Sequence, residues 1–166
     1  MNFNQEWMAR FGWPHVEDLH LPLAIAHRGA SDYRMENTLE AFHLAAELGA
    51  EMWEMDFRLS MDGVVVVCHD ETLSRVAGNQ LRIPDATWAE ISAVELPGNL
   101  RVPRLEEVIE LARRTNSGLY IELKAAEAAE PTWQILREQD FRFAVIGSFH
   151  ADWIAQLRQS KCSYPL

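Results

Sequence analysis

The stretch from residue 51 to residue 70, EMWEMDFRLSMDGVVVVCHD, constrains the fold more than any other part of the chain. Its first half alternates large apolar residues with Glu54, Asp56 and Arg58. Strict alternation predicts a β-strand, because successive side chains of a strand point to opposite faces of the sheet. Two carboxylates on one strand face repel each other, and burying them is costly unless a cation lies between them.

The second half of this stretch is an unbroken apolar run, Val64–Cys68, that ends in His69 and Asp70. A strand followed at once by ionisable groups is typical of α/β enzymes, which present catalytic side chains at strand ends. A hairpin with a surface turn at Asp62-Gly63 is an equally good interpretation, because Asp-Gly favours tight turns. The short connection 60–63 therefore leaves two paths open, a hairpin and a crossover that has degenerated into a loop.

Length and composition limit the class of protein. The chain has 166 residues, which fits one domain, and we expect a single domain over residues 1–166. Its net charge of -10 argues against a nucleic-acid partner, which would need basic patches. No apolar run approaches the ~20 residues of a membrane helix, and the first residues lack a secretory signal pattern. Because there are only two cysteines and no disulfide framework, we expect a cytoplasmic location.

Strand and helix patterns alternate along the rest of the chain. This alternation predicts a parallel α/β fold, and polar residues at successive strand ends are the arrangement of a (β/α)8 barrel of the TIM type. Such barrels typically have ~250 residues, so we expect this chain to cover roughly the first five β/α units. The predicted strands are 21–26, 51–59, 64–68, 118–124 and 143–147, and the predicted helices after the first are 87–96, 103–115, 132–139 and 152–159.

Three segments have particular predictions. Asn37 precedes the first predicted helix and Glu40 follows three residues later, which predicts that Asn37 caps this helix in a capping box. Residues 1–20 read as an N-terminal extension. Residues 71–102 read as an excursion between barrel units, because glycine and proline interrupt them repeatedly.

Ionisable residues gather at the predicted strand ends. The oxygen ligands among them, without cysteine or a paired-histidine helix, favour magnesium or calcium over zinc. Two imidazoles can share the acid and base roles near neutral pH, and fixed cations suit the oxygens of a phosphate. Cleavage of a phosphodiester needs this combination. The seven residues are His27, Arg28, Glu54, Asp56, His69, Glu122 and Lys124.

Each of these signals also has a structural interpretation. A histidine at a strand end is commonly a hydrogen-bonded structural residue. Glu122 and Lys124 share one strand face and can pair as ions, and Glu54 with Asp56 fits an exposed strand face. Taken together, however, seven ionisable residues at four strand ends are poorly explained as structural residues.

An ordered series of motifs resembles the glycerophosphodiester phosphodiesterases, members of the wider phospholipase-C-like barrel group. The resemblance covers about residues 23–160. Two features depart from the family pattern: the usual proline before ENT is Met35, and the family continues for several further strands, so we expect the C-terminal strands to be missing. The matching motifs are HRG (27–29), ENTLEAF (36–42), EMD (54–56), DG (62–63), VVVVCHD (64–70), VPRLEEV (102–108), IELK (121–124) and SF (148–149).

The resemblance implies metal-dependent hydrolysis of glycerophosphodiesters to sn-glycerol 3-phosphate and an alcohol. The family reaction implies a cyclic phosphate, formed when the glycerol 2-hydroxyl attacks phosphorus. The implied site residues are His27 and His69 as acid and base, Arg28 and Lys124 at the phosphate, Glu54, Asp56 and Glu122 at one divalent cation (Mg²⁺ or Ca²⁺), and Glu36 as a secondary contact.

Two other functions stay open at this point. One is a lipid-directed phosphodiesterase of the sphingomyelinase-D type. The other is an inactive or incomplete fragment of the family that acts as a metal-binding or partner-dependent subunit. An open barrel also leaves unpaired strand edges, which favour self-association, so a second copy that closes the barrel is a further expectation.

Overall fold

A computed structural model describes residues 3–14 and 22–166; the remainder of the expected extension and the first residue of the first predicted strand lie outside it. Its centre is one sheet in which four strands run parallel in the order β1-β2-β4-β5, and β3 pairs with β2 in the antiparallel direction. This architecture confirms the predicted α/β fold with a mostly parallel sheet. The strands are β1 (Ile25–His27), β2 (Met52–Leu59), β3 (Val65–Val67), β4 (Gly118–Leu123) and β5 (Ala144–Gly147).

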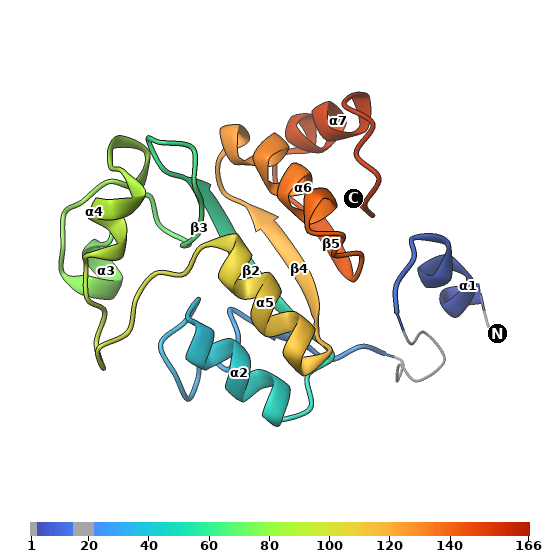
Figure 1. Ribbon diagram of the computed structural model, residues 1–166, viewed down its shortest axis with the longest axis horizontal. Coiled ribbons are helices and arrows are strands. Elements are labelled where there is room, and N and C mark those ends of the chain that lie inside the picture. Colours follow the sequence, from blue (N-terminus) through green and yellow to red (C-terminus); the bar gives the residue numbers. More distant parts are fainter. Residues whose placement is uncertain (1–2, 15–21) are drawn as a thin grey trace.

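Helices α2, α5, α6 and α7 form a row along one face of the sheet (Figure 1). In the sequence, α5 starts with acidic and ends with basic residues, which complement the helix dipole. The helices are α1 (Phe3–Arg10), α2 (Leu39–Glu47), α3 (Ser74–Ala77), α4 (Trp88–Ser92), α5 (Leu105–Thr115), α6 (Ala129–Glu138) and α7 (Ala151–Gln159), with 3₁₀ turns η2 (Ile83–Asp85) and η3 (Ala126–Ala128).

The alternation along β2 divides its side chains between the two faces of the sheet. Trp53, Met55 and Phe57 are fully buried in the core beneath the helices, where Trp53 stacks on Phe42 of α2 with ring centroids 5.4 Å apart. Burying one large apolar side chain contributes roughly 1.5–3 kcal/mol. Packing of these three residues therefore fixes the register of β2, and with it the positions of the carboxylates on the opposite face.

The path of the 60–63 connection is now clear. The backbone N–H of Ser60 donates to the carbonyl of Val64, and β3 runs back along the end of β2 as a hairpin. The hairpin interpretation is therefore confirmed, and β3 is not a parallel barrel strand, because so short a connection cannot cross over the sheet. The reversal brings the segment after β3 beside the middle of β2, where the backbone N–H of Cys68 donates to the carbonyl of Asp56.

The excursion 71–102 contains α3, η2 and α4 and lies beside β3, on the left in Figure 1. It packs around a second, smaller core that includes Val66 and Cys68 from the hairpin segment. The capping box at Thr87 starts α4, which is shorter than the helix predicted over 87–96. The excursion is thus attached directly to the segment that carries His69.

One local prediction is wrong. Asn37 does not cap α2: the hydroxyl of Thr38 accepts the backbone N–H of Ala41 and is the cap. Asn37 has a φ of 57°, in the left-handed region, and its buried side chain faces the polar side of β2 instead. The helix therefore begins one residue later than predicted, and the side chain of Asn37 takes part in the site described below.

Segments from both ends of the chain pack against the sheet. Met8 and Trp13 are buried in the main core, and the ring of Trp13 lies 4.9 Å from that of Phe143. Tyr164 is buried in the same core, and the backbone N–H of Ile146 in β5 donates to the carbonyl of Pro165. The last residues of the chain therefore lie along the outer edge of β5.

Candidate active site

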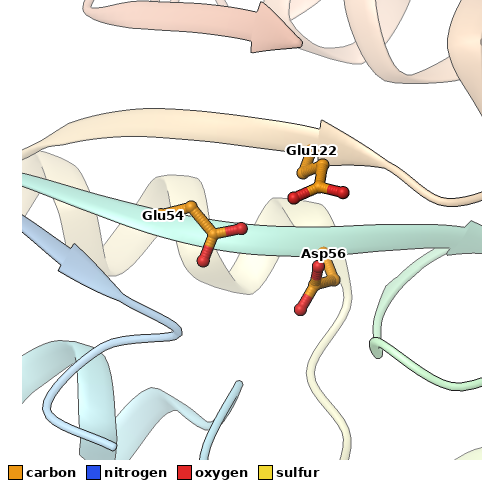
Figure 2. A group of neighbouring side chains, drawn as sticks. All are labelled: Glu54, Asp56 and Glu122. Atoms are coloured by element: carbon orange, nitrogen blue, oxygen red, sulfur yellow. The ribbon is translucent and has the colours of Figure 1, made fainter. Parts of the chain in front are cut away.

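Three carboxylates project from the face of the sheet opposite the helices (Figure 2). Asp56 on β2 is the register partner of Glu122 on β4, and Glu54 precedes Asp56 by two residues on the same face. One oxygen from each carboxylate lies within 4.8 Å of the others. Glu54 and Asp56 are buried and Glu122 is half-buried, so the parallel register gathers three acids in a partly desolvated place.

The electrostatic consequence is clearest at Glu54. Burial, followed by the negative charge of Asp56, raises the pKa of Glu54 to about 7. One hydrogen bond opposes this shift, because the backbone N–H of Arg28 donates to Oε2 of Glu54 at 2.9 Å. Without a further cation, Glu54 therefore holds a proton well above the ordinary range of a carboxyl group.

Asp56 is enclosed by positive and hydrogen-bonding groups. Nδ2 of Asn37 donates to Oδ2 of Asp56 at 2.8 Å, and Nε of Arg28 lies 3.2 Å from the same oxygen. Nζ of Lys124 lies 3.2 Å from Oδ1 of Asp56 and also pairs with Glu122. Arg28 and Lys124 therefore flank the carboxylates and offset part of their charge.

The end of β1 and the loop that follows it position His27 and Arg28. The following residue, Gly29, has a φ of 78°, and a Cβ atom there would lie 2.7 Å from the carbonyl carbon of Ala41. Only glycine allows this close approach of the loop to α2. The ring of His27 is largely exposed on the open side of the site, with Nε2 at 3.8 Å from Oε2 of Glu54.

Glu36 lies behind Arg28. Its Oε1 accepts a hydrogen bond from Nη1 of Arg28 at 3.0 Å, and both of its oxygens accept from Arg75 of α3. The hydrogen bond from Arg75 is the main reason that the pKa of Glu36 lies below its ordinary value. Glu36 is therefore ionised, and its contacts are to two arginines.

His69 follows the hairpin. Nδ1 of its ring lies 2.6 Å from Oδ1 of Asp70, and its carbonyl accepts two hydrogen bonds from Arg58, at 3.0 and 2.8 Å. Asp70 in turn accepts a hydrogen bond from Nε of Arg75 at 2.6 Å. His69 is thus held by its backbone and its ring, and it is linked to Glu36 through Asp70 and Arg75.

The structure brings seven of the eight predicted site residues into one set of direct contacts, and it links His69 to that set through two intermediates. Sequence reasoning missed Asn37, Asp70 and Arg75 as members of the site. Asp70 had a signal, because it follows His69 directly. The sequence around Asn37 predicts a helix cap, and Arg75 carries no signal, because its partner Glu36 is 39 residues away in the sequence.

The carboxylates fit a hard divalent cation. Oε1 of Glu54 and Oδ1 of Asp56 are buried, and neither has a hydrogen-bond partner among residues 3–14 and 22–166. Buried oxygens without a partner are costly, and the ammonium group near Oδ1 of Asp56 is close enough to pair but not aligned for a hydrogen bond. Oxygen ligands alone suit Mg²⁺ or Ca²⁺, so Glu54, Asp56 and Glu122 are the residues that would hold such an ion.

The model of the glycerophosphoryl diester phosphodiesterase family matches residues 27–166. The chain belongs to this family. The match begins at His27 and includes every residue of the site described above. Family membership confirms the resemblance drawn from the ordered motifs.

Known members of the glycerophosphodiester phosphodiesterase family are similar over most of this chain. The "Probable glycerophosphodiester phosphodiesterase 2" of Mycobacterium tuberculosis is 34% identical over 86% of this chain, which spans 54% of that relative's length. The solved glycerophosphodiester phosphodiesterase of Thermotoga maritima is 37% identical, with a TM-score of 0.73. The alignment covers 83% of this chain and 59% of the Thermotoga maritima protein.

A solved phosphodiesterase of Oleispira antarctica, in complex with the product sn-glycerol-3-phosphate, is 29% identical with a TM-score of 0.75. The alignment covers 84% of this chain and 62% of the Oleispira antarctica protein. These likenesses confirm the TIM-barrel fold class, to which the described residues contribute four parallel strands and the antiparallel β3. Among the helices that the structure describes, none has the length and apolar character needed to cross a membrane.

Proposed function

We propose that this family member hydrolyses glycerophosphodiesters to sn-glycerol 3-phosphate and an alcohol, and that the reaction depends on a divalent cation. The observation that carries the proposal is the group of three carboxylates within 4.8 Å, flanked by Arg28, Lys124 and the ring of His27. The product bound to the Oleispira antarctica phosphodiesterase supports this choice of substrate. The family match favours this reaction over a sphingomyelinase-D type activity or an inactive fragment.

Arg28 and Lys124 bind the phosphate in this proposal. Both are largely buried cations beside the carboxylates, and both are fixed by ion pairs rather than free to move in solvent. Cations held in place in a partly desolvated site stabilise negative charge that develops on phosphoryl oxygens. Mg²⁺ or Ca²⁺, bound by Glu54, Asp56 and Glu122, would supply Lewis-acid polarisation of the phosphodiester.

His27 and His69 share the proton transfers. One imidazole accepts the proton of the glycerol 2-hydroxyl as its oxygen attacks phosphorus, which closes a cyclic phosphate. The other protonates the alkoxide of the departing alcohol. Water then opens the ring with the two roles reversed, as the requirements of acid–base catalysis predict. Both rings are accessible: that of His27 is 69% exposed and that of His69 is 34% exposed.

Three further proposals concern the chain as a whole. We propose that residues 1–166 form one domain, with 1–20 as an extension and 71–102 as an excursion that shapes substrate choice. The packing of the excursion against the hairpin that carries His69 supports this role. The cytoplasmic location and a second copy that closes the open barrel are also proposals. The second copy is based on the edge position of β1 among the described strands and on the exposure of Ile25 in it.

Product analysis tests the reaction. We expect the purified chain to convert glycerophosphocholine into sn-glycerol 3-phosphate and choline, and to leave sphingomyelin intact. Release of phosphocholine and glycerol, or of choline from sphingomyelin, would contradict the proposal. His27→Gln and His69→Gln should lower turnover by about 100-fold or more. His43→Gln is the matched control, because His43 is exposed on α2 and pairs only with Glu47 in the described residues.

A further inference from the structure

A continuous set of hydrogen bonds connects His69 to Arg28 by way of the excursion. His69 bonds to Asp70, Asp70 to Arg75, Arg75 to Glu36, and Glu36 to Arg28. The donor–acceptor distances along this path lie between 2.6 and 3.0 Å. The path joins the candidate acid–base residue on the hairpin to the candidate phosphate-binding residue on the loop after β1.

Arg75 occupies the centre of this path. Its Nε donates to Asp70, while Nη1 and Nη2 donate to the two oxygens of Glu36. A planar guanidinium can hold two carboxylates in fixed directions at once, which an ammonium group cannot do. Burial alone would raise the pKa of Asp70, but hydrogen bonds from Arg75 and His69 lower it below its ordinary value. Asp70 is therefore an ionised acceptor.

The ionised state of Asp70 decides which nitrogen of His69 carries the proton. A carboxylate only accepts hydrogen bonds, so Nδ1 of His69 must donate to it. In the neutral ring, Nε2 is then the free nitrogen that can exchange a proton with substrate. The groups that contact His69 are Asp70 at the ring and Arg58 at the carbonyl, with Arg75 and Glu36 behind Asp70.

We propose that Arg75 is a positioning residue for His69. It fixes the Asp70 carboxylate, which holds His69 in the Nδ1–H form. Through Glu36 it also connects this arrangement to Arg28. The inference rests on the proposed phosphodiesterase activity only for its effect on turnover. Its effect on the tautomer of His69 is independent of that activity.

The two ion pairs that Arg75 itself makes contribute little to folding. The side chain of Arg75 is 48% exposed, and exposed ion pairs add little stability. Loss of Arg75 should therefore change the site much more than the stability of the chain. This contrast separates a positioning role from a merely structural one.

Arg82 provides a matched control within the excursion. Its side chain is 47% exposed, and it also pairs with two carboxylates, those of Glu71 and Asp85. In the described residues these partners contact neither His69 nor Arg28. Arg82→Gln therefore removes a similar pair of surface ion pairs without interrupting the path.

The test compares wild type, Arg75→Gln, Arg75→Lys and Arg82→Gln by hydrolysis kinetics and by ¹⁵N NMR of the histidine rings, with His69→Gln to assign the His69 signals. In Arg75→Gln we expect kcat to fall by about 10- to 100-fold, as for a misplaced catalytic group, and KM to stay within about twofold. The His69 signals should move from the Nδ1–H pattern toward the Nε2–H pattern. Arg75→Lys should recover both properties only in part, and Arg82→Gln should match wild type.

If Arg75→Gln and Arg82→Gln have the same kcat and the same ¹⁵N signals from the His69 ring, the inference is overturned. If Arg75→Gln lowers the melting temperature strongly, Arg75→Lys, which keeps the charge, decides the question by the same two readouts. If the wild-type chain releases no product, the proposed function fails, and the tautomer of His69 still tests the positioning role.

Discussion

Asp56 on β2 and Glu122 on β4 are direct partners in the parallel register of the sheet, so their carboxylates lie side by side on the face without helices. Together with Glu54 they form a group of three carboxylates that repel one another and are partly removed from water. Such an arrangement weakens folding unless a cation compensates it. Whether this group binds one divalent cation therefore decides how the site works.

The first prediction concerns pH and Glu54. Its pKa is about 7 in the fold against 4.5 for an ordinary Glu, so the folded chain binds this proton more tightly than the unfolded chain. The stability contributed by Glu54 protonation is therefore present below about pH 4.5 and is lost as the pH rises toward about 7. The difference corresponds to about 3 kcal/mol at most for the metal-free chain.

Urea unfolding in EDTA between pH 4.5 and 8 measures this effect. Glu54→Gln should reduce the fall in the free energy of unfolding over this range. Glu127→Gln, at an exposed position, should keep the wild-type slope. The same slope in all three proteins would mean that Glu54 does not hold a proton near neutral pH.

The second prediction concerns stabilisation by metal. An ion that binds only the folded chain stabilises it by about 2.7 kcal/mol at a concentration 100 times its Kd. We expect Mg²⁺ or Ca²⁺ to raise the melting temperature of the wild type and to have little effect on Glu122→Gln. Glu127→Gln again serves as the control, since Glu127 follows β4 but lies outside the group of carboxylates. An equal shift in Glu122→Gln would exclude Glu122 as a ligand.

The third prediction concerns Asn37. Asn37→Ala removes two hydrogen bonds with Asp56: one that Nδ2 of Asn37 donates to the buried carboxylate, and one that Oδ1 of Asn37 accepts from the backbone N–H of Asp56. We expect a loss of about 1–3 kcal/mol for the buried acceptor, in addition to the cost of a left-handed backbone. Asn116→Ala isolates the backbone cost, because Asn116 has a φ of 53° at the exposed end of α5. Equal losses in the two variants, measured by urea unfolding, would contradict a role of Asn37 at Asp56.

The fourth prediction concerns the turn that follows His27 and carries Arg28. Gly29→Ala would place a Cβ atom 2.7 Å from the backbone of Ala41, so the loop must move. Gly63→Ala has a similar positive φ but open space around the added atom, and it should cost only about 1–2 kcal/mol. We expect Gly29→Ala to lose more stability than Gly63→Ala and to lose turnover as well. Similar melting temperatures and turnover in the two variants would show that the loop does not depend on this close approach.

Much of the site was predictable from the sequence because local patterns encode it. The alternation of β2 places Glu54 and Asp56 on one face, and a strand with the same period places Glu122 beside them once the two strands are parallel. The order of the motifs then predicts which histidines and cations belong to the site. Helices α2, α5, α6 and α7 were predicted within a few residues, since their apolar stripes and dipole charges are local features, whereas α1 and α3 were not predicted.

The rest depended on tertiary contacts. Asn37 has the sequence features of a helix cap, and only its contact with Asp56 shows that it serves the site. The bridge from Arg75 to Glu36 joins the excursion to the loop after β1 across 39 residues, a distance at which no local pattern acts. The turn at Asp62-Gly63 fitted two paths, and pairing between β2 and β3 decides between them.

The most direct test of cation dependence is sn-glycerol 3-phosphate release by EDTA-stripped protein as Mg²⁺ or Ca²⁺ is added back. We predict no release in EDTA and a return of activity that saturates at one bound cation per chain, with Asp56→Asn remaining inactive. Release of the same product at the same rate in EDTA would contradict the account, because the three carboxylates would then have no cation to bind during the reaction.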